Sequence, residues 1–306
     1  MVRLIAILLV LVGPLSSSLS AAEKEVGLRM IIVSQKDEAN AIVKQLRKGA
    51  SFTALAHAKS LGELRRSWGL SGVVRLDEVD EALRPTLQNL KLGKVSKPTR
   101  LRKKYAILKA ISPQIPRLYE TAQEAMQKGE TKSAVRALRT ALKLESDSVQ
   151  TYLLLGHAYS KAKQHSAAIQ AMEKARSYAA DEPGVSILLA TVYANAAAHN
   201  KQKPLAKKAI AAYQRAMKLD KSLAPMAHFG LGKLYVETLK QPDKAIGYLE
   251  KAVAVTPNAA EAHGMLIQAY YDSKRYKRAW RQLRQAQQQG FEFPNLLAAL
   301  HKVKKK

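Results

Sequence analysis

Residues 152–175 read YLLLGHAYSKAKQHSAAIQAMEKA, and this stretch decides the fold of the C-terminal half. The large side chains of Tyr152, Leu155 and Tyr159 recur at the three- and four-residue spacing of one helix face. Small residues at Gly156 and Ala168 stand where two antiparallel helices must approach each other closely. The stretch therefore predicts a pair of packed helices joined by a short turn.

The second helix of this pair carries two alanines seven residues apart, and such a pair occurs five times along the chain. Successive first members are separated by 34, 41, 36 and 34 residues, which is the period of stacked helix-turn-helix repeats. We therefore expect an all-α helical-repeat solenoid of about five repeats over residues 117–290. The alanine pairs are Ala134/Ala141, Ala168/Ala175, Ala209/Ala216, Ala245/Ala252 and Ala279/Ala286.

These repeats resemble the tetratricopeptide repeat (TPR) family. Gly156 and Tyr159 carry the resemblance in one copy, and Gly232 and Tyr235 carry it in another. The resemblance implies a protein or peptide partner. Residues 291–306 are assigned to a capping helix and a basic tail, because four apolar residues there share one helix face: Leu296, Leu297, Leu300 and Val303.

The first 22 residues have the composition of a secretory signal peptide. Arg3 precedes an apolar run from Leu4 to Val12, and Ser20-Ala21-Ala22 provides the small residues of a cleavage site. We therefore predict a signal peptide over residues 1–22 and an exported, periplasmic protein that is soluble or peripherally membrane-associated. The sequence contains no cysteine, which excludes disulfides and thiolate metal sites.

Between the signal peptide and the repeats, residues 26–111 have the pattern of a small α+β domain, and residues 112–116 form a linker. We expect strands over Leu28–Val33 and Tyr105–Ile111, with helices near Asp37–Arg47 and over Thr53–Lys59 between them. The sequences LRMIIV (28–33), KGASF (48–52), LKLGKVSKP (90–98) and YAILK (105–109) resemble those of parvulin-type (PpiC-like) peptidyl-prolyl isomerases. The predicted fold class is a small α+β parvulin-like domain followed by an all-α TPR solenoid.

The chain departs from the parvulin family at the positions that carry the family's activity. Met30 and Ala106 stand where the family has histidines, and Val79, Leu83 and Gln88 replace the family's Met and two Phe of the proline pocket. Removing one member of a buried hydrogen-bonded pair strands the other, whereas replacing both by apolar groups is nearly neutral. The joint loss of both histidines therefore predicts a degenerate domain that keeps its fold and has no catalytic residues.

The charge balance is strongly basic, because 51 Lys and Arg against 24 Asp and Glu give a formal net charge of +27. Such a charge attracts anionic partners, here an anionic membrane surface or an acidic protein, although a solvated surface is the alternative. Nucleic acid is not expected, since no nucleic-acid-reading motif accompanies the charge. Two clusters are candidate anion-facing surfaces: Arg100, Arg102, Lys103 and Lys104, and Lys274, Arg275, Lys277, Arg278, Arg281 and Arg284.

The first helices of such repeats line a groove, where we expect a protein or peptide partner to bind. No HExxH or other paired-histidine motif is present, and no phosphate loop or dinucleotide fingerprint, so no metal or cofactor is expected. The alternative for the groove residues is that they complete helix packing. The candidate groove residues are Tyr119, Gln123, Leu153, His157, Lys161, Ile187, Thr191, Asn195, Phe229, Lys233, Glu237, Gln268 and Asp272.

Together these features predict an exported protein-protein interaction scaffold or chaperone-like adaptor. Two alternatives remain open. One is an active peptidyl-prolyl cis-trans isomerase, or foldase, whose repeats recruit clients. The other is an assembly factor for an envelope complex or a polysaccharide system.

Overall fold

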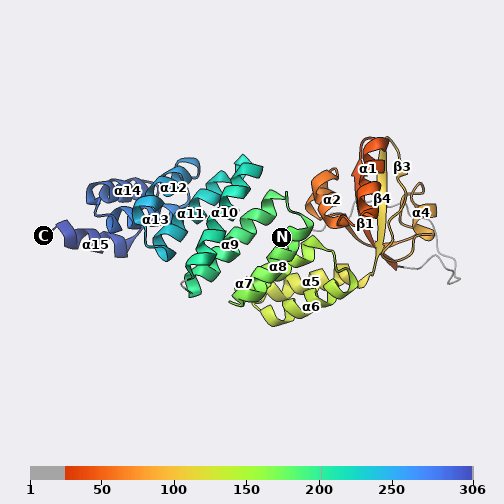
Figure 1. Ribbon diagram of the computed structural model, residues 1–306, viewed down its shortest axis with the longest axis horizontal. Helices are drawn as coiled ribbons and strands as arrows, with labels where there is room; N and C mark the ends of the chain where they lie inside the picture. The colour runs from red at the N-terminus through yellow and green to blue at the C-terminus, as the bar shows by residue number, and fades with distance from the viewer. Residues whose placement is uncertain (1–24, 201, 305–306) are drawn as a thin grey trace. The chain divides into compact units, whose positions relative to one another are not determined.

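The computed structural model describes residues 25–200 and 202–304, so the predicted signal peptide lies outside the described residues (Figure 1). The chain divides into two compact units, the first ending at Ala158 and the second beginning at Tyr159. The boundary falls within helix α7 (Val149–Lys161).

The N-terminal domain, residues 25–111, is built on a four-stranded antiparallel sheet with the strand order β2-β1-β4-β3. The predicted strands over 28–33 and 105–111 lie within β1 and β4, the two central strands, where apolar and β-branched residues dominate. The strands are β1 (Glu25–Val33), β2 (Leu70–Arg75), β3 (Thr99–Leu101) and β4 (Lys104–Ile111); the helices are α1 (Lys36–Arg47), α2 (Phe52–Lys59), α3 (Glu63–Arg66) and α4 (Arg84–Gln88).

The two faces of this sheet have different coverings. Because side chains alternate along a strand, Ile31 and Ile107 point to one face, where they pack against α1 and α2. Leu28, Ala106 and Leu108 pack on the other face, against the segment that ends in α4. We call the first the α1/α2 face and the second the α4 face.

Three helices of the first unit follow the N-terminal domain. Helix α5 (Gln114–Gln127) packs against α6 (Thr131–Leu144), and α7 comes next. The predicted linker over 112–116 is shorter in the structure, because α5 already begins at Gln114 and only Ser112 and Pro113 separate it from β4. Helix α5 also contacts β1 and β2.

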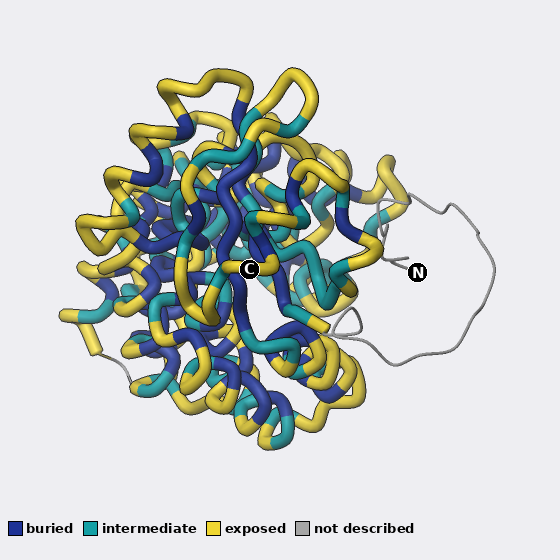
Figure 2. Tube along the Cα trace, turned by 90° about the vertical axis from the view of Figure 1, so that its right-hand side faces the viewer, coloured by how far each residue is buried: buried dark blue, intermediate teal, exposed yellow. Residues whose placement is uncertain are grey.

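The second unit consists of helices in which each packs against the next, from α8 to α14. Buried and exposed residues alternate along these helices, since each helix buries one face. Figure 2 shows such alternation along helical parts of the chain. The first alanines of the predicted pairs in this unit, Ala168, Ala209, Ala245 and Ala279, are all fully buried. The elements are α8 (His165–Tyr178), α9 (Pro183–Asn200), α10 (Lys203–Leu219), η2 (Lys221–Leu223), α11 (Ala224–Lys233), the π-helical turn η3 (Leu234–Thr238), α12 (Pro242–Val255), α13 (Ala260–Asp272), α14 (Tyr276–Gln288) and α15 (Pro294–Lys304).

The predicted capping helix corresponds to α15. It packs against α13 and α14, and Leu300 on its inner face is buried. Leu296 and Leu297 lie partly buried against the same core. Helix α15 therefore covers apolar surface at the end of the second unit.

Candidate functional site

The α4 face of the N-terminal domain, where the resemblance to parvulins predicts the two histidine positions, is packed with apolar side chains. Ala106 is fully buried on β4. Met30 lies partly buried on β1 against the same cluster as Leu28 and Leu108. Neither Met30 nor Ala106 has a side-chain group that transfers a proton, and neither makes a strong side-chain hydrogen bond.

Three leucine and valine side chains complete this apolar cluster from the segment before and within α4. Val79 and Leu83 are buried at the predicted pocket positions, but Gln88 is exposed and does not line the site. Leu87 is buried instead, because it lies four residues after Leu83 and therefore on the same side of the helical segment. Val79 and Leu83, two of the predicted pocket positions, therefore belong to a packed apolar core.

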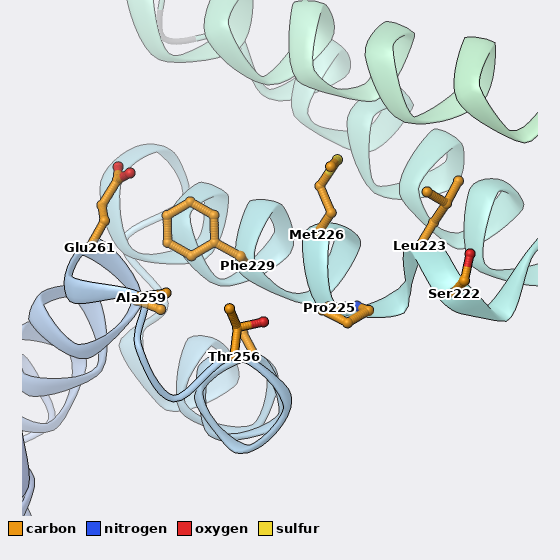
Figure 3. Close-up of a pocket in the computed structure, with 10 residues that line it drawn as sticks. Ser222, Leu223, Pro225, Met226, Phe229, Thr256, Ala259 and Glu261 are labelled. Atoms are coloured by element: carbon orange, nitrogen blue, oxygen red, sulfur yellow. The ribbon is translucent and has the colours of Figure 1, made fainter. Parts of the chain in front are cut away.

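The second candidate site is a pocket of about 370 Å³ in the second unit, between α11, the end of α12 and the start of α13 (Figure 3). Phe229, one of the predicted groove residues, lines it. Met226 also lines it, and 57% of this residue is exposed. We call it the α11–α13 pocket. Its other lining residues are Ser222, Leu223, Pro225, Ala252, Thr256, Ala259, Glu261 and Ala262.

An ion pair joins the two helices at the rim of this pocket. Lys233 Nζ on α11 donates to Glu261 Oε1 on α13 at 2.7 Å. The hydrogen bond to Glu261 raises the pKa of Lys233 against the opposing effect of partial burial, and the nearby Glu237 carboxylate adds to the rise. The rim charges therefore compensate each other, and the pocket presents mainly apolar surface.

Most of the other predicted groove residues are accessible on their helices. Gln268 Nε2 donates to Asp272 Oδ1 at 2.7 Å, and Thr191 donates to the Ile187 carbonyl. The accessible or partly accessible predicted residues are Gln123, Leu153 and His157 in the first unit and Lys161, Thr191, Asn195, Phe229, Lys233, Glu237, Gln268 and Asp272 in the second.

Of the ten residues that line the pocket, only Phe229 belongs to the groove that the sequence predicts; Met226 and Glu261 are among those that it missed. Met226 lies three residues before Phe229, and Glu261 lies seven residues before Gln268. Both spacings keep a residue on the same helix face. An extension of the predicted face toward each helix N-terminus would therefore have found them.

Two predicted groove residues are buried and are not available to a ligand. Tyr119 is 8% exposed, because its hydroxyl lies in a cluster with Ser148 and Thr151 inside the first unit. Ile187 is buried on α9, a helix that packs against α8, α10 and α11 and is covered on several sides. For these two residues the helix-packing alternative is correct.

The two basic clusters are exposed. Arg100, Arg102, Lys103 and Lys104 surround the turn between β3 and β4. In the second cluster, Arg275 pairs with Asp243 at 2.8 Å and Arg278 approaches Glu250 at 4.0 Å, so these two residues also join α14 and the turn before it to α12. Lys274, Lys277, Arg281 and Arg284 are exposed beside them.

Among residues 25–200 and 202–304, no group of three or more His, Cys, Asp or Glu side chains is arranged to hold a metal ion. In the same part of the chain, no helix has the length and apolarity that crossing a membrane requires.

Comparison with known families identifies both parts of the chain. Residues 32–112 match the PPIC-type PPIASE domain. Residues 125–200 and 238–302 match one family of tetratricopeptide repeats, and residues 206–254 match another. No curated protein matches the chain.

Several solved structures resemble the helical part. A MamA fragment (41-end) from Desulfovibrio magneticus RS-1 is 18% identical with a TM-score of 0.51, and the match covers 59% of this chain and 97% of that one. The pilF protein of Pseudomonas aeruginosa is 19% identical with a TM-score of 0.51, covering 63% and 85%. A thermophilic TPR protein in Thermus thermophilus is 18% identical with a TM-score of 0.49, covering 63% and 100%.

At these identities the likeness to solved structures concerns the fold alone. The predicted fold class and the predicted family resemblances are both confirmed by the family matches and the arrangement of strands and helices. The chain is a PPIC-type PPIase domain followed by tetratricopeptide repeats.

Proposed function

We propose that this protein is an exported interaction adaptor that binds an apolar segment of a partner protein in the α11–α13 pocket. The observation that carries the proposal is the pocket itself, an apolar hollow with Met226 more than half exposed on its wall. Concave sites lined by apolar side chains, with a few polar groups at the rim, are the usual ligand sites of proteins. TPR proteins in general bind proteins or peptides, which supports a peptide segment as the occupant.

Selection of peptides from a displayed library on the mature chain tests this proposal. We expect the selected peptides to share a large apolar residue, and Met226→Glu to weaken their binding at least about tenfold, or 1.4 kcal/mol. The substitution places a charge in the apolar pocket beside Glu261. Binding is measured by fluorescence anisotropy with labelled peptides.

Val255→Glu is the matched control for this measurement. Val255 is also a large exposed apolar residue of the second unit, with 65% exposure, but it does not line the pocket. The Val255→Glu variant should bind the peptides with the affinity of the unmodified chain. Equal weakening by both substitutions, or peptides without an apolar anchor, would contradict the proposal.

We further propose that the N-terminal domain has no prolyl isomerase activity. An isomerase must lower a barrier of about 18–20 kcal/mol by acting on a bound prolyl peptide. The α4 face offers Met30 and Ala106 at the two histidine positions and fills the adjoining volume with leucine and valine side chains. These features favour a domain that keeps the fold of the family without its chemistry.

The mature chain should therefore leave the cis-trans relaxation of an X-Pro peptide at its uncatalysed rate, over tens to hundreds of seconds. The double substitution Met30→His with Ala106→His should also give little acceleration, because Leu83 and Leu87 still fill the pocket. Relaxation is followed by NMR exchange or a protease-coupled assay, with an active parvulin as the positive control. An acceleration proportional to the concentration of repurified protein would disprove the proposed inactivity and favour the foldase alternative.

We also propose that the protein is exported and that its basic surface contacts an anionic partner. The signal-like sequence of residues 1–22 supports export to the periplasm. The exposed clusters at Arg100–Lys104 and Lys274–Arg284 support contact with an anionic membrane surface or an acidic protein, because an exposed basic surface raises the local concentration of such partners.

A further inference from the structure

A buried network of charges joins the N-terminal domain to the turn between α6 and α7. Arg29 on β1 is fully buried, and its Nε donates to Glu145 Oε2 at 2.8 Å. Lys109, its cross-strand neighbour on β4, donates from Nζ to Glu145 Oε1 at 2.8 Å and to Asp147 Oδ1 at 3.3 Å. Arg29 also donates to the Trp68 carbonyl and to the Tyr119 hydroxyl, both at 3.0 Å.

Hydroxyl groups continue this network along the same surface. Ser51, the N-cap residue of α2, donates from Oγ to the Asp147 carbonyl at 2.8 Å. Thr53 Oγ1 accepts the Val149 N–H at 2.9 Å, so a side chain of the N-terminal domain satisfies a free donor at the start of α7. On the repeat side, the Tyr119 hydroxyl lies 2.6 Å from Thr151 Oγ1 and 3.1 Å from Ser148 Oγ.

These polar groups are buried, so they need one another as partners in the folded unit. Burial alone would raise the pKa of Glu145, but the Arg29 and Lys109 cations outweigh that cost and lower the pKa below its ordinary value. More than half of the buried polar side chains in the described residues belong to this one network. If the turn moved away, Arg29 would lose its carboxylate partner Glu145, and the N–H of Val149 at the start of α7 would lose its acceptor Thr53.

We propose that the N-terminal domain serves as a structural clamp for the helices that follow it in the first unit. It holds the α6–α7 turn through Arg29, Lys109, Ser51 and Thr53 and thereby fixes α5, α6 and the start of α7 in place. The proposal does not depend on what the α11–α13 pocket binds. It gives the domain a function that needs no catalytic residue.

The geometry of the sheet separates this function from the family's activity. Arg29 and Lys109 share the strand parity of Ile31 and Ile107, so they lie on the α1/α2 face. Met30 and Ala106 belong to the opposite, α4 face. The clamp can therefore be kept while the α4 face loses its histidines. The two-residue connection of Ser112 and Pro113 is consistent with a fixed arrangement, because a mobile tether needs a longer flexible segment.

A substitution in the N-terminal domain should thus change the hydrogen exchange of amides in the helices that follow it. In the full mature chain, Thr53→Val keeps the shape of the side chain and removes the acceptor for Val149 N–H. We expect hydrogen exchange of the amides at the start of α7, residues 149–155, to accelerate on the order of tenfold, the effect of about 1.4 kcal/mol. Exchange in α12 to α14 should not change.

Thr86→Val is the matched control, since it removes a hydroxyl that pairs with Thr99 in the same domain, away from the repeats. It should leave the α7 amides unchanged. The converse variant, Tyr119→Phe in α5, removes one of the Arg29 contacts from the repeat side. It should accelerate exchange of the Met30 amide, which is bonded to Gly69 O beside Trp68. The clamp is disproved if Thr53→Val leaves hydrogen exchange unchanged at all amides after Ile111. It is also disproved if Tyr119→Phe leaves hydrogen exchange unchanged throughout the N-terminal domain.

Discussion

Glu145→Gln is expected to lower the free energy of unfolding of the first unit by about 3–5 kcal/mol. Glu145 is the shared carboxylate between Arg29 and Lys109, and its side chain is 2% exposed. Its neutralisation leaves the fully buried Arg29 guanidinium without an anion, and it leaves the nearly buried Lys109 ammonium with only the longer contact to Asp147. Removing one member of a buried ion pair costs far more than an exposed pair contributes, because water cannot replace the lost partner.

Two further variants test whether the lost stability comes from uncompensated charge or from a change in side-chain shape. Replacing Arg29, Lys109 and Glu145 together by methionine should recover most of the lost stability, since an apolar group of similar volume needs no partner. Glu63→Gln should change stability by less than about 1 kcal/mol, because its pair with Arg66 is exposed. Urea unfolding in a Trp280→Phe background, with Trp68 as the remaining tryptophan, reports on the first unit. A Glu145→Gln variant as stable as Glu63→Gln would contradict the prediction.

The same network has a defined pH dependence. The pKa of Glu145 is lowered in the folded chain from its ordinary value of 4.5, so the unfolded chain binds its proton first as pH falls. The stabilisation by this group is therefore fully present above about pH 5. It declines below about 4.5 and is lost once the pH falls through the lowered folded value. Glu145→Gln should lack this part of the acid dependence.

The repeats were predictable because their signal is local and recurs. An alanine pair at every helix crossing can be recognised in each copy without its neighbours, and Ala134, Ala168 and Ala209 are fully buried. The strands over 28–33 and 105–111 were predictable for a similar reason, because each is a short apolar run between turn signals.

The clamp network was not predictable from such signals. Arg29 and Lys109 look like ordinary polar positions in two strands, and Glu145 is 116 residues away from Arg29 in the chain. No periodicity marks a contact of that separation. Tyr119 was assigned to the groove by its repeat position, whereas its hydroxyl is held by Thr151 and Ser148. In each case the position of the side chain is determined by a hydrogen-bond partner that is distant in the sequence, which a periodic pattern does not reveal.

Only part of the pocket could be predicted from the sequence. Phe229 follows from the repeat pattern, but the hollow exists because Met226 and Glu261 lie at the N-terminal ends of α11 and α13, above the end of α12. Helix ends are the least certain part of any prediction from sequence. A site formed where three ends meet therefore needs the structure.

Gly232→Ala should destabilise the second unit by about 1–3 kcal/mol, although alanine is the better helix former. An added Cβ at this position would fall inside the contact distance of Leu249 Cγ and Cδ2, and Leu249 is fully buried on α12. The collision involves the branch point of the leucine, which moves only if α11 and α12 move apart. Gly247→Ala is the matched control, because Gly247 lies on the exposed side of α12 with open space around its Cα.

The two substitutions should therefore shift stability in opposite directions. Gly247→Ala is expected to stabilise the unit by about 0.5–1 kcal/mol, since alanine loses less conformational freedom in a helix than glycine. Urea unfolding in a Trp68→Phe background measures both, because Trp280 packs against the core that contains Leu249. Equal stabilisation by both alanines would mean that α11 and α12 do not approach as closely as the small-residue pattern requires. Opposite signs would show that glycine is kept at position 232 for the close approach and not for the backbone.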